Sequence, residues 1–191
     1  MSFEKICFPK VATTFFNGHT NITNNSFVAF GVKGLLQASE NIRNAMLFNV
    51  LSYMANELLT RGNTVASIDE LYLFLTNPTA IEYIRNFMKR VRKKESAVIL
   101  SSQNLEDFNI DGIREFTKPL FSIPTHVFLF NAGNIDAKFY TDTLQLEESE
   151  YNLIKYPQRG VCLYKCGNER YNLMVQAPEY KAKLFGKSGG R

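Results

Sequence analysis

Two adjacent carboxylates, Asp69 and Glu70, directly follow the short apolar segment from Thr64 to Ile68. A short, apolar and partly β-branched segment predicts a strand of a parallel sheet that is covered on both faces. Ionised carboxylates at the end of a buried strand are costly unless a cation or hydrogen bonds receive them. Because open α/β sheets bind ligands at the carboxyl ends of their strands, we expect both acids to face a ligand there.

An apolar strand that ends in Asp-Glu is the pattern of a Walker B site. In such a site the aspartate holds Mg²⁺, usually through water, and the glutamate polarises the water that attacks the terminal phosphate. This reading makes Asp69 the metal-associated acid and Glu70 the catalytic acid. The alternative is structural: the pair caps the next helix and complements its dipole.

A side-chain amide ends the next predicted strand. Residues 96–104, SAVILSSQN, form an apolar segment that closes with Ser101, Ser102 and Gln103. If this strand is the parallel neighbour of the first, Gln103 lies at the same sheet edge as the two acids. An amide there can sense a γ-phosphate or orient water. The alternative is a polar strand end without a role.

A run of basic residues lies between the acids and Gln103. Its members are Arg85, Lys89, Arg90, Arg92, Lys93 and Lys94. One interpretation is a solvated helix face. The others are an arginine that reaches a neighbouring subunit's phosphate, as arginine fingers do, and a contact with the DNA backbone. The spacing of the run does not choose among the three.

The sequence contains no phosphate-binding loop of the form Gly-x-x-x-x-Gly-Lys-Ser/Thr. Gly186-Lys187-Ser188 lacks the earlier glycine, and no helix follows it to offer its N-terminus to a phosphate. Such a loop supplies the backbone amides and the lysine that hold the β- and γ-phosphates. We therefore expect this chain alone neither to bind ATP tightly nor to hydrolyse it.

Composition predicts a globular chain. The 191 residues are 45% hydrophobic and 21% charged, which is enough for one domain with a sizeable core. The net charge of +4 is too small to argue for nucleic acid or an anionic membrane. Cys7, Cys162 and Cys166 form an odd set without a neighbouring pair of histidines, so neither a disulfide framework nor a zinc site is favoured. A reducing, cytoplasmic setting is the simpler interpretation, and no apolar run reaches the roughly 18 residues of a membrane span.

The order of the predicted elements indicates an α/β fold. Strand patterns alternate with helical patterns, which favours right-handed crossovers and a parallel sheet. Gly167-Asn168, between two alternating segments, predicts a β-hairpin. Besides the hairpin we expect strands at 27–32, 64–68, 96–104 and 125–131, and helices at 38–60, from 77 onward and in the segment SEYNLIKY.

These elements predict one domain over residues 1–191. Its α/β core is expected at 15–135, followed by a C-terminal helix and hairpin at 136–180 and a flexible tail at 181–191.

Four segments stand in a recognisable order: FFNGHTNI, VASIDELYLFL, RVRKKESAVILSSQN and LQLEESEYNLIKYPQRGVCLY. With them the chain, from about Phe15 onward, resembles the C-terminal part of the VirB/TraC/TrbE-type ATPases of conjugative type IV secretion. These ATPases belong to the HerA/FtsK branch of RecA-like P-loop motors. The resemblance implies a partial RecA-like P-loop NTPase core, in which helices flank a mainly parallel sheet, with a C-terminal β-hairpin and without the P-loop strand.

The resemblance also implies roles for individual residues. Asp69 corresponds to the magnesium-associated acid, Glu70 to the catalytic glutamate and Gln103 to the glutamine of the motif after the next strand. Arg92 matches the family's arginine-lysine element, and Arg90 is the other candidate for a residue that acts across a subunit boundary. The family's P-loop lies well upstream of the Walker B strand, so we expect it to come from another segment or another chain.

As a whole, the resemblance implies a C-terminal portion of a motor that couples ATP hydrolysis to DNA or protein transfer. It implies ATP and Mg²⁺ as cofactors of the complete protein. The implied partners are the rest of the ATPase or identical subunits in a hexamer, type IV secretion channel components and DNA. The implied location is the cytoplasm, with a peripheral position at the inner face of the cell membrane as a further option. Two alternatives stay open: a non-enzymatic remnant that docks on the full-length ATPase or channel, and a DNA-binding module that uses residues 85–94.

Overall fold

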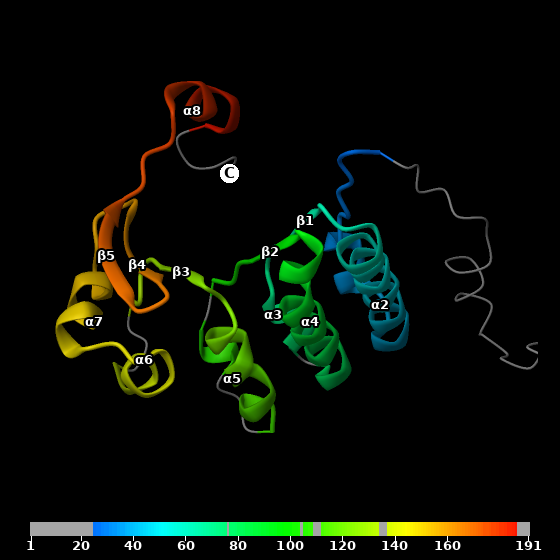
Figure 1. The fold of residues 1–191 in the computed structure, drawn as a ribbon, viewed down its shortest axis with the longest axis horizontal. Coiled ribbons are helices and arrows are strands. Elements are labelled where there is room, and N and C mark those ends of the chain that lie inside the picture. Colours follow the sequence, from blue (N-terminus) through cyan, green and yellow to red (C-terminus); the bar gives the residue numbers. More distant parts are fainter. Residues whose placement is uncertain (1–24, 76, 104, 109–111, 134–136, 187–191) are drawn as a thin grey trace, which may run out of the picture. The chain divides into compact units, whose positions relative to one another are not determined.

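The structure is a computed structural model that describes residues 25–75, 77–103, 105–108, 112–133 and 137–186 (Figure 1). The described chain divides into two compact units between Asn56 and Glu57. The single domain expected over residues 1–191 stays a prediction. No helix among the described residues is long and apolar enough to cross a bilayer.

The described part of the first unit is helical. It holds the short helix η2 (Lys33–Gln37) and the long helix α2 (Glu40–Asn56). In sequence α2 continues into η3 (Glu57–Arg61), so the helix predicted at 38–60 is confirmed. The strand predicted at 27–32 is wrong, because this segment pairs with no strand of the described chain. Phe30 instead sets its ring edge-on to that of Tyr53, with 5.4 Å between the centroids.

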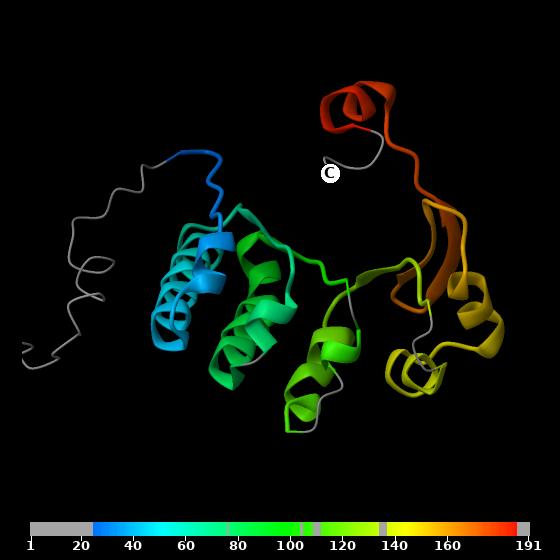
Figure 2. The ribbon, with the colours of Figure 1, turned by 180° about the vertical axis from the view of Figure 1, so that it is seen from behind.

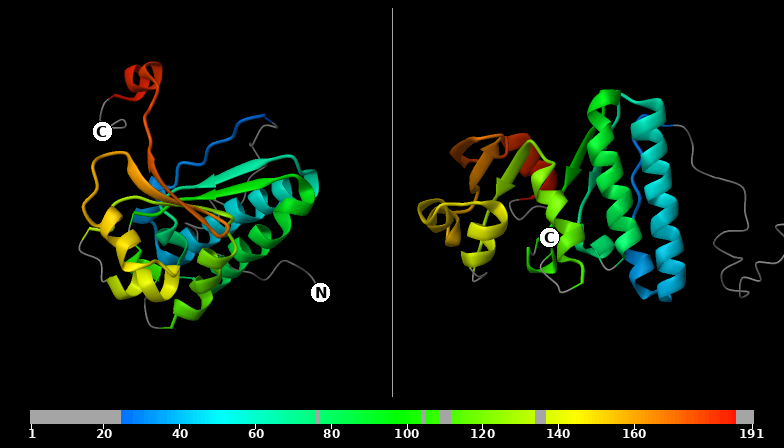
Figure 3. Two further views of the ribbon diagram at one scale, coloured as in Figure 1. Left: turned by 60° about the vertical axis from the view of Figure 1, so that its left-hand side comes forward. Right: turned by 60° about the horizontal axis from the view of Figure 1, so that its bottom comes forward.

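Two parallel strands open the second unit. Strand β1 (Val65–Ile68) pairs with β2 (Ala97–Leu100) in the register Val65↔Ala97 to Ile68↔Leu100. Figure 3 shows the two strands side by side in its left-hand view. The helices α3 (Tyr72–Leu75), α4 (Pro78–Arg90) and η4 (Val91–Lys94) connect them. The predicted parallel pairing of these two segments is therefore confirmed.

Only one face of this pair is covered by the described residues. Ile68 is 5% exposed, whereas Val65 and Ile99, on the opposite face, are 67% and 56% exposed. The prediction of burial on both faces was wrong at these positions. An apolar segment shows that a strand can be covered on both sides, but the cover has to come from other segments.

Helix α4 begins as the sequence predicts. The side-chain oxygen of Asn77 accepts hydrogen bonds from the N–H groups of Thr79 at 3.0 Å and Ala80 at 3.4 Å. Pro78 occupies the first turn, where its missing N–H costs nothing. The apolar positions recur at helical spacing, so α4 buries one face in the core. The buried residues of α4 are Ala80, Ile81, Ile84 and Phe87.

The second sheet is antiparallel. Strand β3 (His126–Leu129) pairs with β4 (Val161–Cys166), and β4 pairs with β5 (Glu169–Met174). The hairpin around Gly167-Asn168 is confirmed. The expectation that the third strand joins the parallel sheet was wrong, since β3 pairs with the hairpin instead. An apolar strand pattern does not specify which neighbour, or which direction, a strand pairs with.

Helices accompany the antiparallel sheet. They are η5 (Glu106–Phe108), α5 (Arg114–Ser122), α6 (Ala137–Leu144) and α7 (Glu148–Lys155). Figure 2 shows α7 beside the hairpin. The predicted helix in SEYNLIKY is confirmed as α7. The strands β3 and β4, the helices α6 and α7 and the adjoining loops share a core of Leu129, Ala132, Phe139, Tyr140, Leu144, Leu146, Tyr151, Ile154 and Leu163.

Three other sequence expectations concern the cysteines and the tail. Cys162 is fully buried and Cys166 half-buried, and both are free thiols. Cys7 lies outside the described residues. The tail expected to be flexible over 181–191 begins within a helix, α8 (Glu179–Phe185), and residues 187–191 lie outside the described residues.

Candidate functional site

The register of the parallel pair brings the two acids beside the end of β2. Ile68 and Leu100 form the last pair of the sheet, so Asp69 and Ser101 leave it at the same edge. The backbones remain bonded beyond the strands: the N–H of Ser101 donates to the carbonyl of Ile68 at 2.9 Å, and the N–H of Leu71 donates to that of Ser101 at 3.0 Å. The candidate site therefore sits on a fixed backbone at the carboxyl edge, where ligands bind in open α/β sheets.

Asp69 is oriented by two donors. The Ser101 hydroxyl donates a hydrogen bond to Oδ1 of Asp69. The backbone N–H of Glu70 donates to the same oxygen at 3.0 Å. The side chain is exposed, so solvent or a ligand can reach the carboxylate while these bonds hold its direction.

Glu70 is held by the predicted glutamine. Nε2 of Gln103 donates to Oε1 of Glu70 at 2.5 Å, which links residues 33 positions apart in the chain. Glu70 also has a backbone φ of +54°, in the left-handed region. An L-residue there costs roughly 1–2 kcal/mol. Backbone strain of this kind concentrates at functional sites.

The helix-capping alternative for the acids receives less support from these contacts. The helix that follows the acids is α3, and the carboxylates of Asp69 and Glu70 accept from Ser101, Gln103 and the Glu70 N–H, not from N–H groups of α3. The side chains of the pair are thus engaged across the sheet edge by the segment that follows β2.

The two predicted arginines do not meet the acids. Arg90 ends α4 and Arg92 lies in η4, and both precede β2, whereas Gln103 follows it. The four residues of β2 separate the two edges by roughly 13 Å. Both arginine side chains are exposed at the amino edge. Within one chain, neither is positioned to contact a ligand held by Asp69 and Glu70.

The residues of the site fit one side of a magnesium–nucleotide complex. A hard carboxylate oxygen suits Mg²⁺, which in proteins uses one or two carboxylates and completes its shell with water and substrate phosphates. Asp69 and Glu70 offer such oxygens. The described residues hold no group of three or more His, Cys, Asp or Glu side chains that could bind a metal alone. The donor set therefore fits a metal that arrives with a phosphate ligand.

The sequence analysis did not predict the hydrogen bond from Ser101 to Asp69, although the position of Ser101 indicates it. Ser101 follows Leu100, the partner of Ile68, so the parallel register places Ser101 opposite Asp69. The next residue, Ser102, has a buried hydroxyl with no hydrogen-bond partner among the described residues.

The chain is similar to parts of proteins of conjugal transfer and type IV secretion. It is 32% identical over 118 residues to a probable conjugal transfer protein TrbE of Sinorhizobium fredii, and 33% identical over 111 residues to the conjugal transfer protein TrbE of Rhizobium radiobacter. These matches cover 60% and 56% of this chain but only 17% and 13% of the relatives. The type IV secretion system protein CagE of Helicobacter pylori is 26% identical over 155 residues, which cover 79% of this chain and 15% of CagE. No family model matches the chain.

Among solved structures the chain resembles VirB4 of Thermoanaerobacter pseudethanolicus. The TM-score is 0.72 at 30% identity, over 81% of this chain and 42% of VirB4. The resemblance to part of the VirB4/TrbE-type ATPases of type IV secretion is thus confirmed, as is the mixed α/β fold with a small parallel sheet flanked by helices. The chain spans less than half the length of the solved VirB4 chain and less than a fifth of these curated relatives.

Proposed function

We propose that this chain forms part of a VirB4/TrbE-type motor that couples ATP hydrolysis to the transfer of DNA or protein, and that it carries the acidic half of the nucleotide site. In that half-site Asp69 holds Mg²⁺, Glu70 polarises the attacking water, and Gln103 senses the γ-phosphate. The bond from Gln103 to Glu70 across two parallel strands carries the proposal, in a chain that matches VirB4 with a TM-score of 0.72.

The chemistry of the contacts supports these roles. General-base catalysis needs a carboxylate within hydrogen-bond reach of water and held in one direction. The Gln103 amide holds one oxygen of Glu70, and Ser101 with the Glu70 N–H holds one oxygen of Asp69. Both carboxylates are therefore oriented before a ligand binds.

The other half of the site would come from a segment that carries a phosphate-binding loop. That loop follows a strand and precedes a helix. Only one edge of β2 pairs with a described strand, and Val65 and Ile99 lie exposed on one face of the pair. A strand that joined the other edge of β2 in parallel would end beside Gln103, which would bring its loop to the acids.

Arg90 and Arg92 act, in this proposal, on a neighbouring subunit. Their place at the amino edge of β2 separates them from the acids of their own chain. Arginine fingers supplied in trans stabilise the charge of the transferring phosphoryl group. This assignment requires identical subunits to assemble, as in a hexamer. The other proposed partners are channel components at the inner face of the cell membrane. This part of the proposal is based on the resemblance to VirB4/TrbE-type proteins.

The test is ATP binding and turnover by this chain alone with Mg²⁺, beside Glu70→Gln. We expect neither binding nor turnover from either protein, with folding verified by circular dichroism. Turnover by the unaltered chain that Glu70→Gln abolishes would refute the half-site proposal. A folded chain that associates with an intact relative and leaves its turnover unchanged after Glu70→Gln would favour the non-enzymatic docking alternative.

A further inference from the structure

We propose that the free edge of strand β5 is an interaction surface and that its partner is a second copy of this chain. The two β5 strands pair antiparallel about a two-fold axis at Asn172 and join two three-stranded sheets into one. Within the described chain β5 pairs on one side only, with β4. The edge of such a strand presents backbone donors and acceptors that another strand can bind. This surface is separate from the acidic half-site, which lies at the ends of β1 and β2.

The hairpin determines which backbone groups of β5 point to the free edge. Residues of an antiparallel pair alternate between those that exchange hydrogen bonds with the partner strand and those whose N–H and C=O point away from it. The N–H of Val175 donates to the carbonyl of Gly160 at 2.7 Å, so Val175 faces the β4 side. Counting back from Val175, alternation leaves three residues of β5 whose backbone groups point outward: Arg170, Asn172 and Met174.

Strand β5 lacks the features that protect an edge strand in natural proteins, which include lysines, prolines and bulges. Its six residues contain neither lysine nor proline and pair with β4 without a bulge. Its cation, Arg170, forms an ion pair with Glu150 of α7, with 3.6 Å between Nε and Oε1. The carboxylate of Glu169 accepts a hydrogen bond from the hydroxyl of Tyr171. Both charges of the strand are therefore engaged within the chain.

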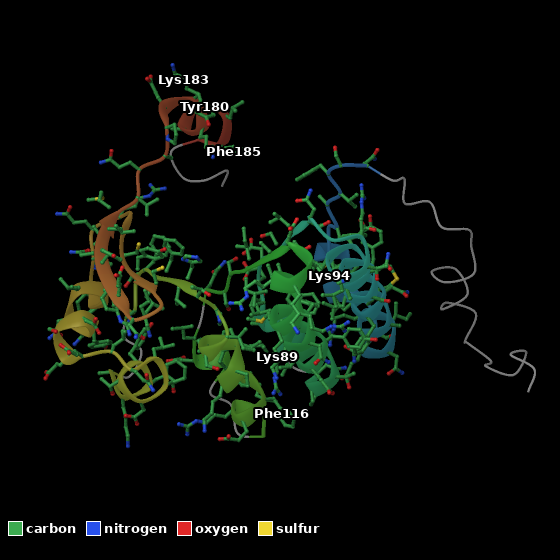
Figure 4. The ribbon with its side chains drawn as sticks, in the orientation of Figure 1. Lys89, Lys94, Phe116, Tyr180, Lys183 and Phe185 are labelled. Atoms are coloured by element: carbon green, nitrogen blue, oxygen red, sulfur yellow. The ribbon has the colours of Figure 1, made fainter. Side chains whose placement is uncertain are left out.

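The helix that follows β5 does not bury its side chains against the strand. No residue of α8 is buried, and Tyr180 and Phe185, which Figure 4 labels, are each 61% exposed. On β5 itself, Tyr171 and Met174 are 44% and 51% exposed. The described chain thus leaves apolar side chains of β5 accessible to a partner, together with the backbone edge.

A second copy fits this edge because β5 is complementary to itself. Two copies of one strand that are related by a two-fold axis run antiparallel. With the axis at Asn172, this residue faces its equivalent and Arg170 faces Met174 of the second copy, so every outward residue forms a hydrogen-bonded pair. An axis at Tyr171 or Leu173 places one outward residue opposite a residue outside β5. An axis at Arg170 places two like charges opposite each other, which is destabilising.

The side chains favour the same register. Tyr171 belongs to a row of stacked rings, with 5.9 Å between its centroid and that of Tyr164 and 4.6 Å between those of Tyr164 and Phe128. With the axis at Asn172, Tyr171 comes opposite Leu173 of the second copy in a pair without hydrogen bonds, where side chains lie closest. Cross-strand pairs that include an aromatic ring stabilise antiparallel sheets. The aromatic row therefore continues into the sheet of the second copy.

Sedimentation equilibrium of the complete 191-residue chain at micromolar to submillimolar concentrations tests the surface. We expect a mass that rises with concentration from 21.8 kDa toward twice that value. Asn172→Lys puts two like charges on the axis and should weaken the dimer by about tenfold or more. The control Asn168→Lys makes the same change in charge in the hairpin turn, away from the axis, and should leave the dimer unchanged.

Oxidative cross-linking tests the register in a Cys7→Ser/Cys166→Ser background, in which the buried Cys162 is kept. We expect Asn172→Cys to form a disulfide between the two copies, because the Cα atoms of a hydrogen-bonded pair lie about 5.5 Å apart, within the range that disulfides span. Met174→Cys, on the same strand and the same side, lies about 14 Å from its equivalent in this register and should not cross-link.

Three results would each overturn the inference. They are a chain that stays monomeric at every concentration, self-association that Asn172→Lys weakens no more than Asn168→Lys does, and a disulfide that forms as readily in Met174→Cys as in Asn172→Cys. Circular dichroism verifies folding, and Asn172→Asp replaces Asn172→Lys if the lysine variant does not fold. None of these measurements involves a nucleotide, so their failure leaves the half-site proposal untouched.

Discussion

Gly62 lies between η3 and β1 and against the end of η4, so its replacement should destabilise the fold by an amount that can be estimated. Its φ is +75°, in the left-handed region, and a Cβ at this position would lie 2.8 Å from the carbonyl oxygen of Lys94. That oxygen accepts the N–H of Asn63, so it belongs to a fixed backbone and cannot move aside as a side-chain end would. Gly62→Ala therefore introduces both backbone strain and a steric conflict.

The two effects can be estimated separately. The left-handed conformation costs an alanine roughly 1–2 kcal/mol. Displacing the Lys94 carbonyl weakens one backbone hydrogen bond, worth about 1 kcal/mol. The sum is about 2–3 kcal/mol, which for a chain of this size lowers the melting temperature by roughly 4–12 °C.

Urea and thermal unfolding, followed by circular dichroism, would measure the loss. Gly167→Ala is the matched control, because Gly167 has a φ of +59° and no atom within 4 Å of the added Cβ. It should show the cost of the left-handed conformation alone, about 1–2 kcal/mol. If Gly62→Ala loses no more stability than Gly167→Ala, the close approach of Gly62 to Lys94 is refuted.

Two further predictions test a helix cap and a buried phenol. Asn77→Ala removes the acceptor of the Thr79 and Ala80 N–H groups and should cost about 1 kcal/mol in urea unfolding, whereas the exposed Asn86→Ala within α4 should be near neutral. Burial is the main cause that raises the pKa of Tyr140 to about 12, with smaller contributions from the nearby Tyr151 and Glu106. Tyrosine in the unfolded chain ionises near 10, so the unfolded state loses its proton first and stability should fall as the pH rises from about 10 to about 12. Ultraviolet titration should show a tyrosine that ionises late and is absent from Tyr140→Phe; a titration unchanged by that substitution would contradict the burial.

The sequence was sufficient to predict the parts of the fold in which local pattern and pairing agree. The β1–β2 pair follows from two short apolar segments separated by a helix, and the Asn77-Pro78 start of α4 follows from capping chemistry. The predicted closeness of Gln103 to the acids is observed, because parallel strands end at a common edge of the sheet. The contact of Ser101 with Asp69 was predictable from the same register, but only once the register was fixed to the residue.

The failed predictions share a physical cause. A strand pattern describes a segment, whereas a strand exists through its partner. Residues 27–32 have strand-like composition but no strand partner in the described chain. Strand β3 pairs with β4, and the sequence of β3 alone does not indicate this partner. The exposure of Val65 and Ile99 likewise depends on which segments are present to cover them. Patterns in a single segment could not supply that information.

The central claim is that Asp69, Glu70 and Gln103 form half of a nucleotide site. Its most direct test joins this chain to a P-loop-bearing segment, such as the region of a VirB4/TrbE-type protein that precedes the matched residues, and measures ATPase activity. The account predicts that the joined protein binds ATP with Mg²⁺ and hydrolyses it, and that Glu70→Gln keeps binding but abolishes turnover. Turnover unaffected by Glu70→Gln, in a joined protein that binds ATP, would contradict the account.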